Sequence, residues 1–336
     1  MHRIIDVNVN RATEALRVVE EVSRFVLEDE GITTELKNLR HEIITAFGSQ
    51  YSQLIENRDT EGDVGTEIPN PSSRKSLIDI HKANFKRLQQ ALRVLSEFNP
   101  GLSDKIRYDS YILEKKMYKE LTNKHKKYLL NDKKLYLVTD RSNFNNEDDF
   151  LNAVASALKG GVQIVQLREK TATAKEFIAL GKKVRELCSL YDAIFIINDR
   201  VDIAMAVQAD GVHLGQDDMD VAIARNILGS EAIIGLSTHC LEHALQAVQA
   251  GADYIGVGPV FTTPTKPGRQ AVGLEYVRWA ADNVNIPWFA IGGINPDNLN
   301  EVVQAGAFRV AAVRAIINAE QPEQAARRFL NISQGG

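Results

Sequence analysis

The sequence predicts an α/β protein in which a C-terminal (β/α)8 (TIM) barrel over residues 134–336 follows an all-α N-terminal domain over residues 1–130. Two observations predict this division. The first half carries apolar residues at the spacing of amphipathic helices, whereas the second half alternates short apolar runs with helical patterns. Eight such runs occur: LYLVTD (135–140), QIVQLRE (163–169), AIFIIND (193–199), GVHLG (211–215), IIGLST (233–238), YIGVGPV (254–260), WFAIGG (288–293) and RVAAVRA (309–315).

We interpret these eight runs as parallel strands, because the helical segments between them are long enough to serve as parallel crossovers. Eight strand–helix units in roughly 200 residues fit a closed barrel at the compact end of its size range. A doubly wound open sheet is the alternative. The count of eight and the lack of a GxGxxG fingerprint after the first run favour the barrel.

The N-terminal half contains an internal repeat, in which NVNRATEALRVVEE (8–21) resembles NFKRLQQALRVLSE (84–97). Chance similarity between amphipathic helices and an ancient duplication are the two explanations, and we favour the duplication. Apolar stripes along helices need a partner surface, so we interpret this half as a packing or dimerisation module that would allow a homodimer. The stripes consist of Ala15, Leu16, Val19, Val22 and Val26, and of Leu36, Leu39, Ile43 and Phe47.

Composition and charge exclude several classes of protein. The formal net charge is −4 over 336 residues, which gives no indication of a nucleic-acid or membrane partner. No apolar run approaches the roughly 20 residues that span a bilayer. The two cysteines, Cys188 and Cys240, provide neither a disulfide framework nor metal-finger spacing. We therefore expect a cytoplasmic protein without nucleic-acid or membrane partners.

The second predicted strand ends in QLREK, which brings charged residues to the barrel mouth. Because side chains alternate across a strand, Gln166, Arg168 and Lys170 share one face, while Leu167 faces the helices. Two adjacent cations repel each other unless an anion compensates them, and Arg and Lys are common phosphate ligands. Glu169 could instead pair with these cations structurally. We favour a bound phosphate group as the compensating anion.

Carboxylates follow the third and fourth predicted strands. Asp199 ends the motif IIND and Asp218 lies in LGQDD, and these strands should be neighbours in the barrel. Two carboxylates suit Mg²⁺, which prefers one or two of them together with phosphate oxygens and water. Asn198 could hydrogen-bond a ligand, whereas His213 is interpreted as a packed, hydrogen-bonded residue. Helix N-capping is the alternative role for any one aspartate after a strand.

The sixth predicted strand leads into a loop, FTTPTKPG, that combines hydroxyls, a cation and prolines. Pro264 and Pro267 reduce the conformational entropy of this loop. Thr263, Thr265 and Lys266 are thereby preorganised for an anionic ligand.

The ends of the seventh and eighth strands are candidates for a second anion site. Gly293 ends the motif AIGG, where a glycine lets backbone N–H groups approach a ligand closely. Val313 and Arg314 follow the last strand, and the loops after strands seven and eight form the usual phosphate site of such barrels. Two anion-binding regions, one with a magnesium pair, indicate two phosphorylated substrates and loss of pyrophosphate. A transferase is the expected activity.

These motifs carry a resemblance to a known family. YLVTD, VQLREK, NDRVDIA, DGVHLGQDD, ADYIGVGPVFTTPTKPG and AIGGI closely resemble thiamine-phosphate synthase over essentially all of residues 134–336. With its additional N-terminal helical region, the chain is similar to the cyanobacterial type of this enzyme. The resemblance implies condensation of 4-amino-2-methyl-5-hydroxymethylpyrimidine pyrophosphate with methyl-hydroxyethylthiazole phosphate. The products are thiamine phosphate and pyrophosphate, and the mechanism is dissociative and Mg²⁺-assisted.

The resemblance also implies roles for individual residues. Asp199 and Asp218 match the Mg²⁺ ligands, and Arg168, Lys170 and Lys266 match the cations that assist catalysis. A serine is common in the family where this chain has Arg314, so the phosphate there receives either a guanidinium contact or backbone N–H contacts alone. The matching substrate-binding residues are Gln166, Leu167, Arg168, Glu169, Lys170, Asn198, Ser237, Thr263, Pro264, Thr265, Lys266, Gly293, Val313 and Arg314.

Two other functions are alternatives for this chain. A thiazole tautomerase resembles the same barrel, but it needs neither the Asp199/Asp218 pair nor the cations of QLREK. A non-catalytic phosphate-ligand sensor, with the helical half as its output module, is the alternative from a different class. Turnover of the two substrates into thiamine phosphate distinguishes these alternatives.

Overall fold

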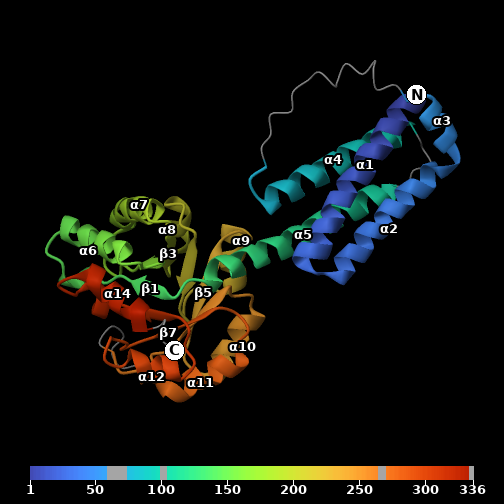
Figure 1. Ribbon diagram of the computed structural model, residues 1–336. Helices are drawn as coiled ribbons and strands as arrows, with labels where there is room; N and C mark the ends of the chain where they lie inside the picture. Colours follow the sequence, from blue (N-terminus) through green and yellow to red (C-terminus); the bar gives the residue numbers. More distant parts are fainter. Residues whose placement is uncertain (59–73, 99–103, 264–269, 333–336) are drawn as a thin grey trace. The chain divides into compact units, whose positions relative to one another are not determined.

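The computed structural model of the chain describes residues 1–58, 74–98, 104–263 and 270–332 (Figure 1). The chain divides into two units, Met1–His125 and Lys126–Gly336, which are described separately here. Within the described residues the first unit is helical and the second contains the strands. In that same part of the chain we find no helix with the length and apolar character of a membrane span.

The first unit is built from amphipathic helices around one apolar core. Asp29 begins the second helix as its N-cap, since its side chain accepts a hydrogen bond of 2.8 Å from the backbone N–H of Ile32. The core consists of apolar residues at helical spacing, such as Leu16, Leu36 and Leu92. The helices are α1 (His2–Val22), α2 (Glu30–Phe47), α3 (Tyr51–Glu56), α4 (Leu77–Phe98) and α5 (Asp104–Asn131), the last of which ends in the second unit.

The internal repeat extends to side-chain interactions. Helix α1 packs along α4, and these helices carry the two copies of the repeated sequence. Asn8 and Asn84, at equivalent positions, each donate a hydrogen bond of 2.8 Å to the carbonyl four residues earlier. Arg17 and Arg93 each form an ion pair with the glutamate four residues later, at 2.7 and 2.8 Å. The two copies therefore share buried and exposed contacts, not only a hydrophobic pattern.

The second unit is a closed barrel of eight parallel strands in sequence order, so the predicted fold class is confirmed. The strands are β1 (Leu135–Val138), β2 (Ile164–Leu167), β3 (Ile194–Asn198), β4 (Gly211–Leu214), β5 (Ile233–Thr238), β6 (Tyr254–Val257), β7 (Trp288–Ile291) and β8 (Val310–Ala312).

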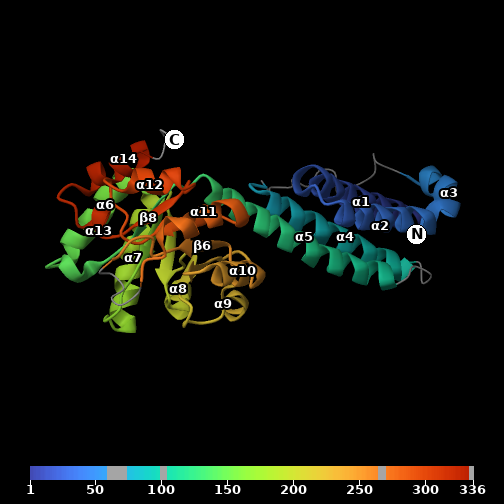
Figure 2. The ribbon, with the colours of Figure 1, turned by 90° about the horizontal axis from the view of Figure 1, so that it is seen from below.

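Helices surround the outer side of this barrel (Figure 2). Helix α7 shows why they begin where they do: Thr173 and Glu176 form a capping box at its first turn. The helices are α6 (Glu147–Lys159), α7 (Ala174–Leu190), α8 (Val201–Ala206), α9 (Val221–Leu228), α10 (Leu241–Gln249), α11 (Gly273–Asn283), α12 (Leu299–Gln304), α13 (Arg314–Ile317) and α14 (Pro322–Ile332).

Alternate strand residues face opposite sides of the barrel wall. Leu137 and Val165 belong to the cluster beneath the helices, whereas Tyr136 and Ile164 belong to the inner cluster. The inner cluster also contains the large side chain of Phe289. Side chains fill the barrel interior, so a ligand cannot enter it. The residues that a ligand can reach are the polar ones at the carboxyl ends of the strands.

The last turns of α5 contact the barrel at the amino-terminal ends of its strands. Leu130 is fully buried within the inner cluster. The Nζ atom of Lys126 lies 2.7 Å from an Asp253 carboxylate oxygen just before β6, and the Lys126 side chain is only 3% exposed. Arg225 binds the other oxygen of that carboxylate at 2.5 Å. This buried, paired charge cluster ties the end of α5 to the barrel.

Candidate active site

A cavity of about 490 Å³ opens at the carboxyl ends of the barrel strands. Residues from all eight strands, or from the loops that follow them, line it. The predicted site residues in its lining are Gln166, Arg168, Asn198, Asp199, Ser237, Thr263, Gly293, Val313 and Arg314.

The end of β2 divides its side chains between the cavity and the outer core. Gln166 and Arg168 line the cavity, as alternation predicts. The backbone N–H of Arg168 is held by the hydroxyl oxygen of Thr139 at 3.1 Å. Leu167, in contrast, is fully buried in the cluster beneath the helices, so its side chain does not reach the cavity. A substrate contact from Leu167 could come only from its backbone.

Lys170 and the two predicted metal ligands come together at the rim. The Nζ atom of Lys170 lies 2.6 Å from the Oδ2 atom of Asp199. Asp199 and Asp218 are hydrogen-bonded to each other, and the backbone N–H of Gly215 donates to Asp218 at 2.6 Å. The backbone of Asp199 is left-handed, with φ of 61°, and its N–H bonds the His213 carbonyl at 2.8 Å. Such a conformation in a non-glycine residue is often found at functional sites.

The contact between the two carboxyl groups separates their pKa values. Burial alone would raise the pKa of Asp199, but hydrogen bonds with Lys170 and Asp218 outweigh it and lower that pKa below its ordinary value. Burial and the hydrogen bond with Asp199 raise the pKa of Asp218. Two adjacent carboxylates need a shared proton or a cation between them.

The donor set at this rim fits Mg²⁺. It consists of two carboxylates rather than a cage of three or more acidic, histidine or cysteine ligands, a group that is absent from the described part of the chain. Mg²⁺ usually retains waters and binds through one or two carboxylates plus phosphate oxygens. The Asp199/Asp218 pair therefore offers the carboxylates that Mg²⁺ binds in proteins.

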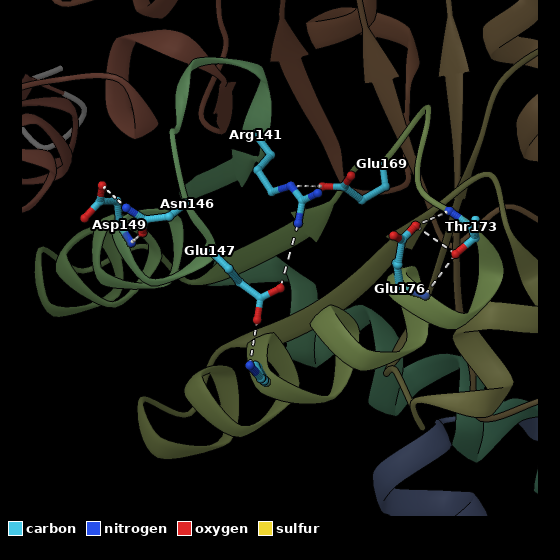
Figure 3. Close-up of polar contacts among 8 residues, drawn as sticks. Arg141, Asn146, Glu147, Asp149, Glu169, Thr173 and Glu176 are labelled. Atoms are coloured by element: carbon cyan, nitrogen blue, oxygen red, sulfur yellow. Dashed lines mark hydrogen bonds and ion pairs between the residues drawn. The ribbon is translucent and has the colours of Figure 1, made fainter.

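The Glu169 side chain does not line the cavity, and the substrate contact expected of this residue stays a prediction. Its side chain is only 6% exposed, and its Oε1 atom lies 3.7 Å from the Nε atom of Arg141 (Figure 3). Arg141 also approaches Glu147, whose carboxylate binds Lys183 at 2.6 Å. Burial raises the pKa of Glu169, and Arg141 opposes that effect. The side chain links the loop after β2 to the loop after β1.

A chain of hydrogen bonds crosses the floor of the cavity. The Nε2 atom of Gln166 donates to the Tyr136 hydroxyl at 2.7 Å, and the hydroxyls of Tyr136 and Tyr254 lie 2.8 Å apart. The Nδ1 atom of His213 lies 3.0 Å from the Tyr254 hydroxyl, and its Nε2 atom lies 2.9 Å from Ser237 Oγ. The expectation that His213 is hydrogen-bonded is confirmed.

Tyr136 and Tyr254 were not among the residues predicted from the sequence. Both occupy inward-facing strand positions, and a buried tyrosine needs a hydrogen-bond partner for its hydroxyl. That requirement, together with an inward-facing Gln166 on the next strand, was the signal that could have identified them.

The loop after β6 lies partly within the described residues. Thr263 lines the cavity, whereas Pro264, Thr265 and Lys266 lie outside the described residues. Gly293 has φ of 67°, and a Cβ atom there would lie 2.8 Å from the Thr262 carbonyl oxygen. The glycine therefore permits close packing of the loops after β6 and β7.

Val313 and Arg314 line the cavity at the end of β8. The Nε atom of Arg314 donates to the Oδ2 atom of Asp140 at 3.2 Å. Burial would raise the pKa of Asp140, but hydrogen bonds from Ser142 and Arg314 lower it. Asp140, which was not among the residues predicted from the sequence, thus compensates the guanidinium charge of Arg314.

Comparisons with known proteins agree with this architecture. A family model described as thiamine monophosphate synthase matches residues 135–316, and one described as the ThiD2 family matches residues 3–116. The chain is 46% identical to a thiamine-phosphate synthase of Nostoc punctiforme, over 96% of this chain and 91% of that protein. It is 44% identical to one from Synechocystis sp., over 98% of this chain and 95% of the relative.

A solved structure is also similar. The thiamine phosphate pyrophosphorylase from Pyrococcus furiosus matches with a TM-score of 0.57 at 40% identity, over 62% of this chain and 98% of that chain. The identity to curated relatives extends through both units, and the first family model spans the barrel. The chain is therefore an enzyme, a transferase, and belongs to the thiamine-phosphate synthase family.

Proposed function

We propose that the barrel joins 4-amino-2-methyl-5-hydroxymethylpyrimidine pyrophosphate to methyl-hydroxyethylthiazole phosphate, with Mg²⁺ as cofactor, to give thiamine phosphate and pyrophosphate. The names of the relatives support the product. The observation that carries the proposal is the contact of Lys170, Asp199 and Asp218 beside a cavity that Arg168 also lines. Paired carboxylates and cations at one rim suit a metal-bound pyrophosphate.

Turnover breaks the bond between the pyrimidine methylene carbon and an oxygen of the pyrophosphate, whose electron pair leaves with it. The thiazole nitrogen then forms the new carbon–nitrogen bond with its lone pair, so no protein nucleophile is needed. Arg168 and Lys170 neutralise the charge that develops on the departing oxygen. Asp199 and Asp218 would hold Mg²⁺, which when bound supplies further charge neutralisation to the pyrophosphate.

The opposite part of the cavity suits the smaller phosphate. Thr263, Gly293, Val313 and Arg314 line it. A phosphate there would compete with Asp140 for the Arg314 guanidinium, which is 41% exposed and so has room to turn. The predicted contributions of Thr265 and Lys266 belong to the same proposal.

A turnover assay with both substrates tests the proposal. Thiamine phosphate and pyrophosphate are expected in equal amounts, only when both substrates and Mg²⁺ are present. Conversion of the thiazole phosphate alone, without consumption of the pyrimidine substrate, would indicate the tautomerase alternative. Replacement of Asp199 by alanine is expected to abolish turnover, and full activity of that variant at saturating pyrimidine substrate would contradict the metal assignment.

A further inference from the structure

The donor at one end of the hydrogen-bond chain on the cavity floor favours one direction for the whole chain. The Nε2 atom of Gln166 donates to the Tyr136 oxygen, and the Tyr254 oxygen 2.8 Å away is the acceptor within reach of the Tyr136 hydrogen, which favours donation from Tyr136 to Tyr254. The Tyr254 oxygen then accepts, and its own hydrogen points to the Nδ1 atom of His213. An Nδ1 atom that accepts leaves the proton of a neutral imidazole on Nε2.

The direction of the chain determines what Ser237 does. In that tautomer the Nε2–H group of His213 donates to Ser237 Oγ, which lies 2.9 Å away. The hydroxyl oxygen of Ser237 is thereby occupied as an acceptor on that side. Since Ser237 lines the cavity, its own hydrogen is directed toward a ligand.

The surroundings hold the chain in place. Tyr136 and Tyr254 are 2% and 1% exposed, and the Phe289 ring packs edge-on against both, with centroids 5.2 and 5.7 Å away. Gly235 leaves room for the Tyr254 ring, since a Cβ atom there would lie 2.1 Å from Tyr254 Cζ. Burial raises the pKa of both tyrosines far above neutrality, so both keep the hydrogens on which the direction depends.

We propose that His213 is a positioning residue: held by Tyr254 with its proton on Nε2, it makes the Ser237 hydroxyl a hydrogen-bond donor toward an acceptor atom of the ligand. This inference rests on the proposed function for the identity of the ligand. The acceptor is a ring nitrogen of the aminopyrimidine or an oxygen of its pyrophosphate. Both present a lone pair, and a group with only a hydrogen at that point would be rejected.

The protonation of the ring is tested in the full chain without any ligand. Nitrogen-15 labelling of the 7 histidines, with long-range proton–nitrogen correlation, shows which ring nitrogen carries hydrogen, and loss of one signal set in His213→Gln assigns the residue. The expected result for His213 is a proton on Nε2 alone. A proton on Nδ1, or on both nitrogens, would overturn the proposal. In Tyr254→Phe the Nδ1 atom loses its donor, so the Nδ1–H form should become populated.

Binding measurements test the role of the hydroxyl. His213→Leu and Ser237→Ala should each bind the pyrimidine pyrophosphate about tenfold more weakly, the loss of roughly one hydrogen bond. His213→Gln retains a donor toward Ser237 and should stay within about threefold of the wild type. The double variant His213→Leu/Ser237→Ala should be no weaker than Ser237→Ala, because both changes remove the same interaction.

Inorganic pyrophosphate with Mg²⁺ identifies the acceptor. An unchanged affinity of His213→Leu for pyrophosphate assigns the acceptor to the pyrimidine ring, and a tenfold loss assigns it to a phosphate oxygen. Wild-type affinity of His213→Leu for both probes would overturn the proposal. If the wild type binds neither probe, the proposed function fails, and ring protonation alone then decides the direction of the chain. Tyr254→Phe, which fills nearly the same volume, serves if His213→Leu does not fold.

Discussion

Replacing Asp199 by asparagine removes one charge from the acidic pair while keeping the shape of the side chain. Asparagine tolerates the left-handed backbone of this position, where φ is 61°, and its N–H can retain the 2.8 Å bond to the His213 carbonyl. The amide can also donate to Asp218, with which Asp199 is hydrogen-bonded. Any loss of activity in Asp199→Asn therefore measures charge and metal binding rather than misfolding.

The expected loss is about 10²–10³ in kcat/KM, or roughly 2.7–4 kcal/mol, the usual cost of removing one group that stabilises developing charge. Asp199→Ala adds a backbone cost of about 1–2 kcal/mol, because alanine disfavours the left-handed region. For a unit of roughly 200 residues this cost corresponds to a fall in Tm of about 2–8 °C. Asp199→Asn should melt within about 2 °C of the wild type.

The assay follows thiamine phosphate formation over a series of Mg²⁺ concentrations, with thermal unfolding of each variant measured in parallel. Asp217→Asn, at the exposed neighbouring aspartate, is the matched control and should retain full activity. The reasoning would be refuted if Asp199→Asn kept wild-type kcat/KM and Mg²⁺ dependence. It would also be refuted if the two Asp199 variants lost equal activity only because both had unfolded.

Three other changes test separate parts of the structure. Lys126→Met should lower the free energy of unfolding by about 1–3 kcal/mol in chemical denaturation, since the Asp253 carboxylate loses its buried lysine partner and keeps only Arg225. Unchanged stability would argue against a stabilising role for that charge cluster. Gly293→Ala should lose at least tenfold in activity, because its Cβ atom would meet the loop after β6. The control is Gly229→Ala, where φ is 85° and the space around the residue is open, so that this change should lower stability alone. Burial raises the pKa of Glu169 above its ordinary value of 4.5. The protonated carboxyl therefore stabilises the fold at pH values below 4.5, and this contribution is lost as pH rises through the pKa of the folded state. Glu169→Gln should therefore gain stability relative to the wild type between pH 4 and pH 7, and a pH-independent difference in urea unfolding would contradict this.

Alternation of short apolar runs with helical patterns was enough to predict the eight barrel strands and their order, although most strands end before the predicted runs do. Consecutive parallel strands are neighbours, so the meeting of Asp199 and Asp218 followed from their places after β3 and β4. Side-chain alternation along β2 predicted that Gln166 faces the cavity, and Arg168 continues that alternation one residue past the strand. Residues that a regular strand positions were therefore predictable.

The remaining contacts depend on features that the local pattern does not contain. The chain leaves the sheet after Leu167, so alternation no longer determines where Glu169 points, and its partner Arg141 comes from another loop. Asp140 meets Arg314 only because the barrel closes β1 onto β8. The first pairing joins the loops after two neighbouring strands, and the second, which spans 174 residues of sequence, depends on closure of the barrel. The homodimer expected from the helical half stays a prediction.

The most direct test of the pyrophosphate site is a calorimetric titration of inorganic pyrophosphate into the full chain, with and without Mg²⁺. The account predicts tight binding only with the metal, and a loss of about 100-fold in both Asp199→Asn and Lys170→Met. Equal binding by the wild type in the absence of Mg²⁺, or unchanged affinity in both variants, would contradict the claim that this rim of the barrel holds the leaving group.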